Sequence, residues 1–303
     1  MRAALLREVD GPFEVGDVPE PAADGKVLVR VRAAGINFAD VMVRRGLYPQ
    51  MPELPAVIGS EIAGELEDGT RVMAITSGGG GYAEMVAVER AQVVPLPDDA
   101  SFAEGASFLL TFLTAHIPLT RQARVRPGSV VLVYAAAGGV GSAAIQVART
   151  LGARVVAAVG SAEKLDVCRS LGAEEAFVYD ELPEDIGADV VVDPVGGELF
   201  ASSFARLRPL GTVIAIGSAA GAWPEIEPAR LVGRNVGLAG FYLGRLLRLD
   251  PELVGEAVGE LLGLWHTGAL KPLVGAEFPL DEVGQAHALV ESRQSVGKVV
   301  LLP

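Results

Sequence analysis

Residues 129–149 read Ser-Val-Val-Leu-Val-Tyr-Ala-Ala-Ala-Gly-Gly-Val-Gly-Ser-Ala-Ala-Ile-Gln-Val-Ala-Arg. The first part, residues 130–134, is a short apolar run behind Pro127-Gly128, which is typical of a strand buried on both faces. From Gly139 onward the period changes, and apolar residues recur at helical spacing at Val140, Ala143, Ala144, Val147, Ala148 and Leu151. The sequence therefore predicts a strand, a glycine-rich turn and a helix in succession.

A glycine-rich turn that opens a helix leaves backbone N–H groups at the positive end of the helix dipole, where they can bind phosphate. Measured against the pattern G-x-G-x-x-G, Gly138 and Gly141 fill the last two glycine positions and Ala136 stands at the first. Two other interpretations are an ordinary strand–turn–helix of a core and a membrane span, since no charge occurs from Pro127 to Ala148. The glycines and the change of period argue against the span.

A second apolar run, residues 155–159, follows the predicted helix, as a β-α-β unit requires. It ends at Gly160-Ser161, where NAD-binding sites usually carry an Asp or Glu that holds the ribose hydroxyls. Ser161 and Lys164 instead offer a hydroxyl and a cation, which suit a 2′-phosphate. The sequence therefore favours NADPH over NADH, with Lys164 as an ordinary solvated helix residue as the alternative.

The composition describes a globular protein with a large core: 303 residues, 50% hydrophobic and 21% charged. The net charge of −13 argues against nucleic acid or an anionic membrane as the principal partner. The one cysteine, Cys168, excludes a disulfide framework and a thiolate metal cluster. With no signal peptide evident, we expect a cytoplasmic protein.

Short apolar or alternating segments separated by Gly, Pro and Asp fill residues 1–107, which indicates a small irregular β-barrel. Further apolar runs at 176–179, 189–192, 212–216 and 236–239 bring the later strands to six, separated mainly by helices. Six strands separated by helices are typical of a doubly wound parallel sheet. We expect an amphipathic helix at 251–265 and a final strand at 299–302 that returns to the first domain.

Three motifs occur in a fixed order: Asn37-x-x-Asp40, Gly59-x-Glu61 and Ala136-x-Gly138-Gly139-Val140-Gly141. With them the chain resembles, over essentially its full length, the bacterial zinc-free quinone oxidoreductases, also called zeta-crystallin-like, of the medium-chain dehydrogenase/reductase superfamily. The resemblance implies an α/β fold: a doubly wound, parallel, six-stranded Rossmann sheet and a second, GroES-like irregular β-barrel domain. We expect the GroES-like substrate domain at 1–107 and 246–303, and the Rossmann NADPH-binding domain at 108–245.

The zinc-dependent relatives carry a cysteine at the position of Asn37 and a histidine at that of Ser60. Neither Asn37 nor Ser60 is a competent zinc ligand, so we expect no metal. Without a Lewis acid to polarise a simple carbonyl, the acceptor must already be electron-deficient, as a quinone or a conjugated enone is.

The resemblance also assigns site residues. The catalytic residues would be Asn37, Tyr48 and Thr114. The alternative for Tyr48 is an aromatic residue that packs in the barrel, and the alternative for Thr114 is a threonine that caps its helix or hydrogen-bonds to its own helix backbone. Asp40 and Glu61 are better explained as structural carboxylates. Met42 replaces a frequent family tyrosine, which weakens any mechanism with a pair of tyrosines. The NADPH-binding residues would be Ala136, Gly138, Gly139, Val140, Gly141, Ser161, Lys164, Tyr179, Gly217, Ser218, Phe241 and Arg293, the last with a surface ion pair as its alternative.

The sequence thus predicts an NADPH:quinone oxidoreductase that transfers hydride, or electrons, in a cleft between the two domains. One alternative is an NADPH-dependent reductase of an activated C=C bond in a 2-alkenal, enone or enoyl thioester. Another is a non-catalytic protein that binds NADPH or RNA. By the same resemblance we expect a homodimer that pairs through residues 233–241. The three histidines lack ligand spacing, so we expect them to be packed or on the surface.

Overall fold

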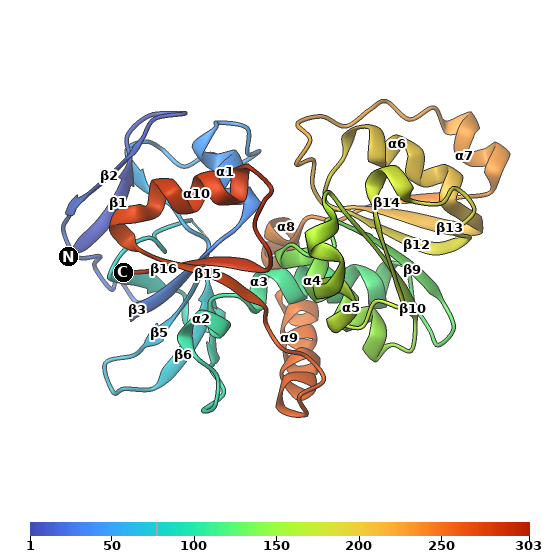
Figure 1. Ribbon diagram of the computed structural model, residues 1–303. Helices are drawn as coiled ribbons and strands as arrows, with labels where there is room; N and C mark the ends of the chain where they lie inside the picture. Colours follow the sequence, from blue (N-terminus) through green and yellow to red (C-terminus); the bar gives the residue numbers. More distant parts are fainter. Residues whose placement is uncertain (77) are drawn as a thin grey trace. The chain divides into compact units, whose positions relative to one another are not determined.

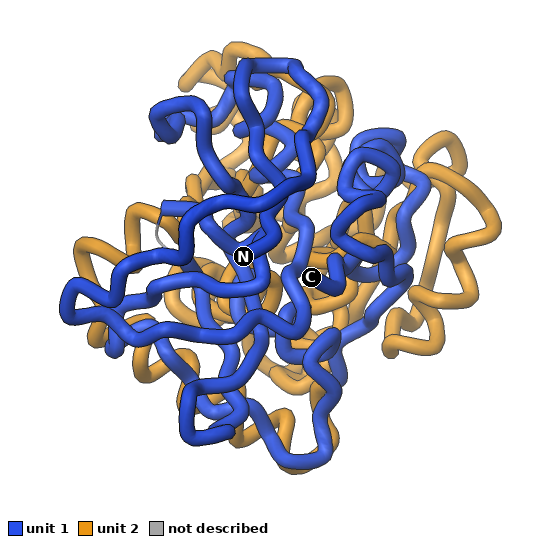
Figure 2. The backbone as a smooth tube through the Cα atoms, turned by 90° about the vertical axis from the view of Figure 1, so that its left-hand side faces the viewer, with its two compact units in different colours: residues 1–110, 271–303 blue, residues 111–270 orange. Residues whose placement is uncertain are grey.

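The computed structural model describes residues 1–76 and 78–303 and divides the chain into two compact units. Unit 1 contains Met1–Leu110 and Lys271–Pro303, and unit 2 contains Thr111–Leu270. Figure 2 shows them in blue and orange. Unit 1 is therefore built from both ends of the chain.

Unit 2 contains a six-stranded, entirely parallel sheet of order β11-β10-β9-β12-β13-β14. Its strands are β9 (Val130–Tyr134), β10 (Arg154–Val159), β11 (Glu175–Val178), β12 (Ala188–Asp193), β13 (Leu207–Ala215) and β14 (Gly237–Gly240). The middle strands are almost continuously Val, Leu, Ile and Ala because both of their faces are buried. The chain runs outward from β9 in both directions, so the order of the strands reverses beside β9, as in a doubly wound sheet.

Helices cover this sheet (Figure 1). Helices α4 (Gly139–Thr150) and α5 (Leu165–Ser170) pack on β9, β10 and β11, whereas α6 (Gly197–Arg206) packs on β12 and β13. The remaining helical segments of the unit are α3 (Leu109–Ile117, which begins in unit 1), η2 (Pro118–Gln122), η3 (Ala162–Lys164), η4 (Tyr179–Glu181), α7 (Pro228–Arg234), α8 (Leu243–Leu249) and α9 (Pro251–His266).

Unit 1 contains an irregular seven-stranded sheet, with β15-β16-β3-β5-β6-β8 in order and β7 paired to β3, and a three-stranded sheet of order β2-β1-β4. These strands are β1 (Arg2–Leu6), β2 (Phe13–Asp17), β3 (Val27–Ile36), β4 (Ala56–Val57), β5 (Glu61–Glu65), β6 (Arg71–Ile75), β7 (Met85–Val88), β8 (Val93–Pro95), β15 (Val274–Pro279) and β16 (Lys298–Leu302). The helical segments are α1 (Phe38–Arg44), η1 (Arg90–Gln92), α2 (Phe102–Gly105), η5 (Leu280–Glu282) and α10 (Val283–Glu291). Because β16 pairs with β3, residues near position 300 lie beside residues near position 35.

The fold class predicted from the sequence is confirmed, but the return to unit 1 occurs at residue 271 and not at 246. Helix α9 stays with unit 2 because it packs on α8, and because its Glu260 pairs with Arg121 and lies 3.2 Å from His116 Nε2. Those ties join segments about 140 positions apart, so the local pattern does not reveal them.

One helical stretch, 102–122, is long and apolar enough to pass for a membrane span by length and composition. From the sequence, the candidate span is 127–148, where no charge occurs. In the stretch 102–122, 83% of the apolar window is buried inside the protein, as in the core helix of a globular protein. Its apolar residues are therefore already covered by protein.

Candidate functional site

The turn between β9 and α4 has the geometry that phosphate binding requires. Gly138 is the N-cap of α4, no side chain caps the helix, and no acidic residue stands in its first turn. The first backbone N–H groups of this 12-residue helix thus remain available for an anion. A Cβ at Gly141 would lie 2.2 Å from the carbonyl oxygen of Ala135, so only glycine permits the close approach of strand and helix.

The other predicted cofactor residues of unit 2 follow the carboxyl ends of neighbouring parallel strands. They come after β10 (Ser161 and Lys164), β11 (Tyr179), β13 (Gly217 and Ser218) and β14 (Phe241). Because the strands are parallel, these ends share the edge of the sheet at which Gly138 begins α4, the edge where doubly wound proteins bind ligands. The backbone N–H of Ala135 donates to the Tyr179 hydroxyl at 3.1 Å, which places that ring beside the glycine turn.

Lys164 is not the solvated residue of the alternative interpretation. Its side chain is 7% exposed, and burial lowers the pKa of its ammonium. Ser161 donates from its hydroxyl to Glu163 at 3.1 Å. Phe241 is buried, and its N–H donates to the Ala215 carbonyl at 2.9 Å. The segment after β10 thus carries a buried lysine, and Ser161 in front of it is already hydrogen-bonded to Glu163.

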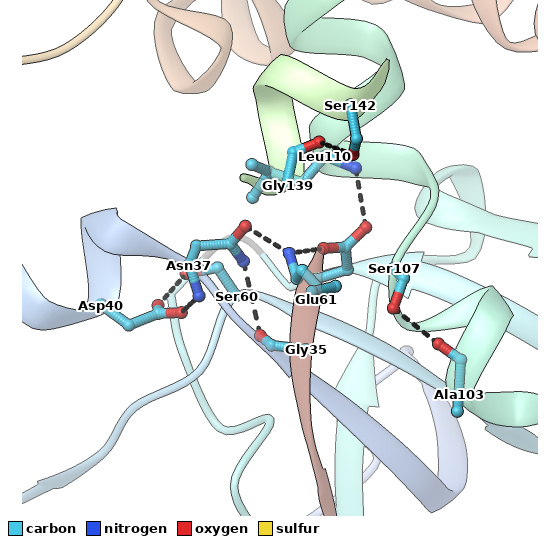
Figure 3. A network of polar contacts seen from close by, with 11 residues as sticks. Gly35, Asn37, Asp40, Ser60, Glu61, Ala103, Ser107, Leu110, Gly139 and Ser142 are labelled. Carbon is cyan, nitrogen blue, oxygen red and sulfur yellow. Dashed lines mark hydrogen bonds and ion pairs between the residues drawn. The ribbon is translucent and has the colours of Figure 1, made fainter. Parts of the chain in front are cut away.

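Unit 1 contains a buried charged centre that consists of Lys298, Glu61 and Asn37. Figure 3 shows Asn37 and Glu61 of this centre with their neighbours. Lys298 is 3% exposed, and its Nζ donates to Glu61 Oε2 at 2.6 Å and to Asn37 Oδ1 at 2.5 Å. The other carboxylate oxygen of Glu61 accepts from the Leu110 N–H at 2.8 Å. The carboxylate is therefore satisfied on both sides.

Asn37 is held at the start of α1 by a capping box with Asp40. Its N–H donates to Asp40 Oδ2 at 2.8 Å, and the Ser60 hydroxyl donates to Asp40 Oδ1 at 2.8 Å. The Asn37 side-chain nitrogen donates to the Gly35 carbonyl at 3.4 Å, and a hydrogen bond from the Asn37 side chain also opposes the raised pKa of Glu61. The buried amide of Asn37 is therefore part of the charged centre.

Burial controls the ionisation of both carboxylates. It raises the pKa of Glu61, against the opposing effect of the Lys298 ammonium, and it raises the pKa of Asp40, against hydrogen bonds from Asn37 and Ser60. Glu61 is fully buried, and a buried carboxylate needs a partner charge to remain ionised. Lys298 is that partner.

The remaining candidates lie in different places. Tyr48 packs against the hydrophobic core of unit 1, and Arg293 follows α10 in unit 1. Thr114 is 5% exposed in α3 of unit 2. The structure thus groups Asn37 with Asp40, Ser60 and Glu61 through hydrogen bonds in which Lys298 takes part.

The sequence analysis missed Lys298. It stands at the start of β16, 261 positions after Asn37. A single lysine in front of an apolar strand resembles an ordinary flanking charge, and only the pairing of β16 with β3 brings it inside. The order of the strands in unit 1 was the missing information.

Across residues 1–76 and 78–303, no group of three or more His, Cys, Asp or Glu side chains is arranged to hold a metal ion. The side chains of Asn37 and Ser60 are already engaged, by Lys298 and Asp40 respectively. These donor groups do not fit a zinc ion.

Comparison with known families places both units. Residues 23–98 match the model of the alcohol dehydrogenase GroES-like domain, and residues 139–258 match that of the zinc-binding dehydrogenases. A quinone oxidoreductase-like protein 2 homolog of Nematostella vectensis is 34% identical over 99% of this chain and 88% of its own.

Solved structures agree with this placement. The quinone oxidoreductase of Thermus thermophilus, determined alone and in complex with NADPH, is 42% identical and superposes with a TM-score of 0.91 over 100% of both chains. A mycobacterial protein determined in complex with NADPH is 35% identical, with a TM-score of 0.92 over 100% of both chains. The chain is therefore an oxidoreductase of the medium-chain dehydrogenase/reductase superfamily and belongs to its quinone oxidoreductase-like branch.

Proposed function

We propose that this protein is an NADPH-dependent quinone reductase that works without zinc. The proposal rests on Asn37 and Ser60, which stand at the two positions where the zinc-dependent relatives carry zinc ligands. The side chains of both residues are already engaged in hydrogen bonds. A quinone needs no Lewis acid, because its ring is already electron-deficient. The resemblance to a quinone oxidoreductase that binds NADPH supports the same conclusion.

A bound nicotinamide would supply the hydride. The N-terminus of α4 would bind the pyrophosphate through the N–H groups of Gly139, Val140 and Gly141. Lys164, Ser161 and Tyr179 would hold the 2′-phosphate end. The choice of NADPH over NADH rests on these residues and on the absence of an Asp or Glu at Gly160-Ser161.

Asn37 would orient the acceptor. Lys298 donates to its side-chain oxygen and so holds the amide in one orientation. The amide nitrogen, whose contact with the Gly35 carbonyl is long at 3.4 Å, would exchange that contact for a quinone oxygen that gains negative charge. Tyr48 and Thr114 remain proposed contacts of the acceptor and of the nicotinamide.

A steady-state screen of quinones, enones, 2-alkenals and enoyl thioesters with each nicotinamide tests the proposal. We expect oxidation of NADPH with quinones, retained after treatment with a chelator. Inert quinones, together with stereospecific transfer of deuteride to carbon in an enone, would instead establish reduction of a C=C bond. Binding of NADPH without turnover of any acceptor would indicate a non-catalytic protein.

We also propose a homodimer that pairs through β14, which is one of the two edge strands of its sheet. Leu238 on this strand is 41% exposed. A charge on an edge strand opposes pairing between chains, so Leu238→Lys should give monomers in light scattering. Leu249→Lys, at an exposed leucine of α8, is the matched control and should leave the mass unchanged.

A further inference from the structure

A surface cavity of about 380 Å³ lies in unit 1 beside η5 and α10. Proteins commonly bind small molecules in pockets of about 300–1,000 Å³, so the cavity has room for a small ligand. Arg44, at the end of α1, lines it together with Phe13, Glu282 and His287, and α1 packs against α10 (Figure 1). Among the described residues, those of the charged centre do not line the cavity.

Two buried nitrogen atoms of this lining have no hydrogen-bond partner in the part of the chain that the structure describes. They are Nε of Arg44 and Nδ1 of His287, and His287 is 1% exposed. Buried polar atoms in folded proteins are almost always hydrogen-bonded. Two unpartnered atoms from two different helices at one cavity therefore point to a polar molecule that binds there.

The other contacts of these two side chains show which of their atoms a ligand can use. Arg44 Nη2 donates to Glu291 Oε2 at 2.9 Å, and Arg44 Nη1 donates to the Gly11 carbonyl at 3.5 Å. Nε2 of His287 lies 3.2 Å from the Tyr82 hydroxyl. Nε–H of Arg44 and Nδ1 of His287 are left, and an arginine can only donate. The ligand must therefore present an acceptor to Arg44.

The charges around the cavity argue against an ionic ligand. Glu291 pairs with Arg44, Glu282 adds a carboxylate to the lining, and so does Asp281, which belongs to an exposed ion pair. Burial and the nearby Arg44 lower the pKa of His287 to about 3, so its ring is neutral. An anion thus meets no excess of positive charge, and an ammonium group cannot accept from Nε–H of Arg44.

A primary amide satisfies both nitrogens in either tautomer of His287. The Tyr82 hydroxyl can donate to Nε2 or accept from it, so Nδ1 is either an acceptor or an N–H donor. The carbonyl oxygen of an amide can accept from Arg44 Nε–H and from an Nδ1–H, and its NH2 group can donate to a bare Nδ1 or to the Glu282 carboxylate. A carboxylate lacks the donor, and an ammonium group lacks the acceptor.

An aromatic wall suits a flat ligand. The ring centroids of Phe13 and His287 lie 4.7 Å apart, with the two planes inclined at 58°. Pro12 and Ala288 add apolar surface to the lining, and aromatic rings pack favourably on one another. We propose that the cavity is a binding site for a neutral aromatic amide, with its amide group at Arg44 and His287 and its ring against Phe13. Such a site is additional to the reductase function and does not depend on it.

Histidine NMR tests the site directly, because the chain has only three histidines, His116, His266 and His287. The probes are benzamide, benzoate and benzylamine, which share one ring and differ in charge. We expect benzamide to shift the ring signals of His287, assigned with His287→Asn, and to leave those of the other two histidines in place. The expected Kd is about 1 mM or lower, the range of a ligand this small. Benzoate and benzylamine should bind at least about tenfold more weakly, because each leaves a buried polar atom unpaired.

Arg44→Met and Arg45→Met form a matched pair of variants. Both arginines pair with Glu291, so in either variant that carboxylate keeps one cation. Arg44 lines the cavity, whereas Arg45 is not among the described residues that do. We expect Arg44→Met to raise the Kd for benzamide at least about tenfold, because the hydrogen bond from Nε–H is lost. Arg45→Met should leave that Kd unchanged.

The parent protein decides the question even if Arg44→Met does not fold. If none of the probes shifts the His287 signals, water alone satisfies the two nitrogens and the proposed site is wrong. Tighter binding of benzoate or benzylamine than of benzamide, or an equal loss in Arg45→Met, would also overturn it. The shift must persist with saturating NADPH, since its loss would place benzamide at a nicotinamide site. A protein that binds benzamide in this way but reduces no quinone would refute the reductase function alone.

Discussion

Lys298 Nζ donates to Glu61 Oε2 at 2.6 Å, and both side chains are buried. Lys298→Met keeps much of the volume but leaves a buried carboxylate without its cation. Breaking such a pair costs about 3–5 kcal/mol, so we expect a loss of that order in the free energy of unfolding measured with urea. Lys26→Met, at an exposed ion pair with Glu89, should change it by less than about 1 kcal/mol.

The double variant Lys298→Met/Glu61→Gln separates charge from packing. It removes both charges, so we expect it to recover part of the stability that Lys298→Met loses. A double variant that is less stable than Lys298→Met would contradict the ionic explanation. The comparison needs only equilibrium unfolding.

Gly141→Ala should disrupt the binding of NADPH. The new Cβ would lie 2.2 Å from the Ala135 carbonyl oxygen. The turn must therefore shift, and its N–H groups would no longer point at the bound phosphate. We expect Kd to rise by at least about tenfold, which corresponds to 1.4 kcal/mol, in a fluorescence titration. Gly259→Ala, in α9 where a Cβ would meet nothing within 4 Å, is the control and should retain the parent Kd.

Lys164→Ala should erode the preference for NADPH. Charge-assisted bonds to a 2′-phosphate are worth about 1.5–3 kcal/mol, so we expect Kd for NADPH to rise at least tenfold and that for NADH to change little. Titrations with both nucleotides measure the ratio, with Lys26→Ala as a control far from β10 in sequence. Equal affinities in the parent protein would refute the 2′-phosphate argument.

His287 should make the protein less stable in mild acid. Its pKa is about 3 in the folded chain against 6.5 for the free side chain, so the unfolded chain binds more protons between these values. Stability is therefore lost as pH falls from about 6.5 toward 3, by on the order of 5 kcal/mol for this group at 1.36 kcal/mol per pKa unit. Urea unfolding at pH 7 and pH 4.5 should show a smaller loss for His287→Asn than for the parent, whereas His266→Asn, at an exposed histidine, should behave like the parent.

The sequence predicts unit 2 well because its signals are local. The change of period at Gly139, the turn glycines and the regular alternation of apolar runs with helices specify a doubly wound sheet, and the six strands occur where the runs stand. Parallel topology then brings Ser161, Tyr179 and Gly217 to one edge of the sheet without any further information. The family resemblance points the same way.

Unit 1 is harder to predict because its decisive contacts are distant in sequence. Asn37 and Glu61 could be named from motifs, but Lys298 enters through strand pairing across more than 230 positions. His287 likewise meets Tyr82 across 205 positions. Neither contact produces a periodic pattern in the sequence. One can therefore predict that a buried carboxylate needs a partner, but not which residue that partner is.

The pairing of β16 with β3 also has a consequence for biosynthesis. A ribosome makes Asn37 and Glu61 early, then all of unit 2, and only afterwards the strand that carries Lys298. Until that strand emerges, the Glu61 carboxylate lacks the Lys298 ammonium with which it pairs in the folded interior. Unit 2, whose residues are contiguous, can fold on the ribosome first, whereas the barrel reaches its final stability only after the segment from residue 271 onward has left the exit tunnel.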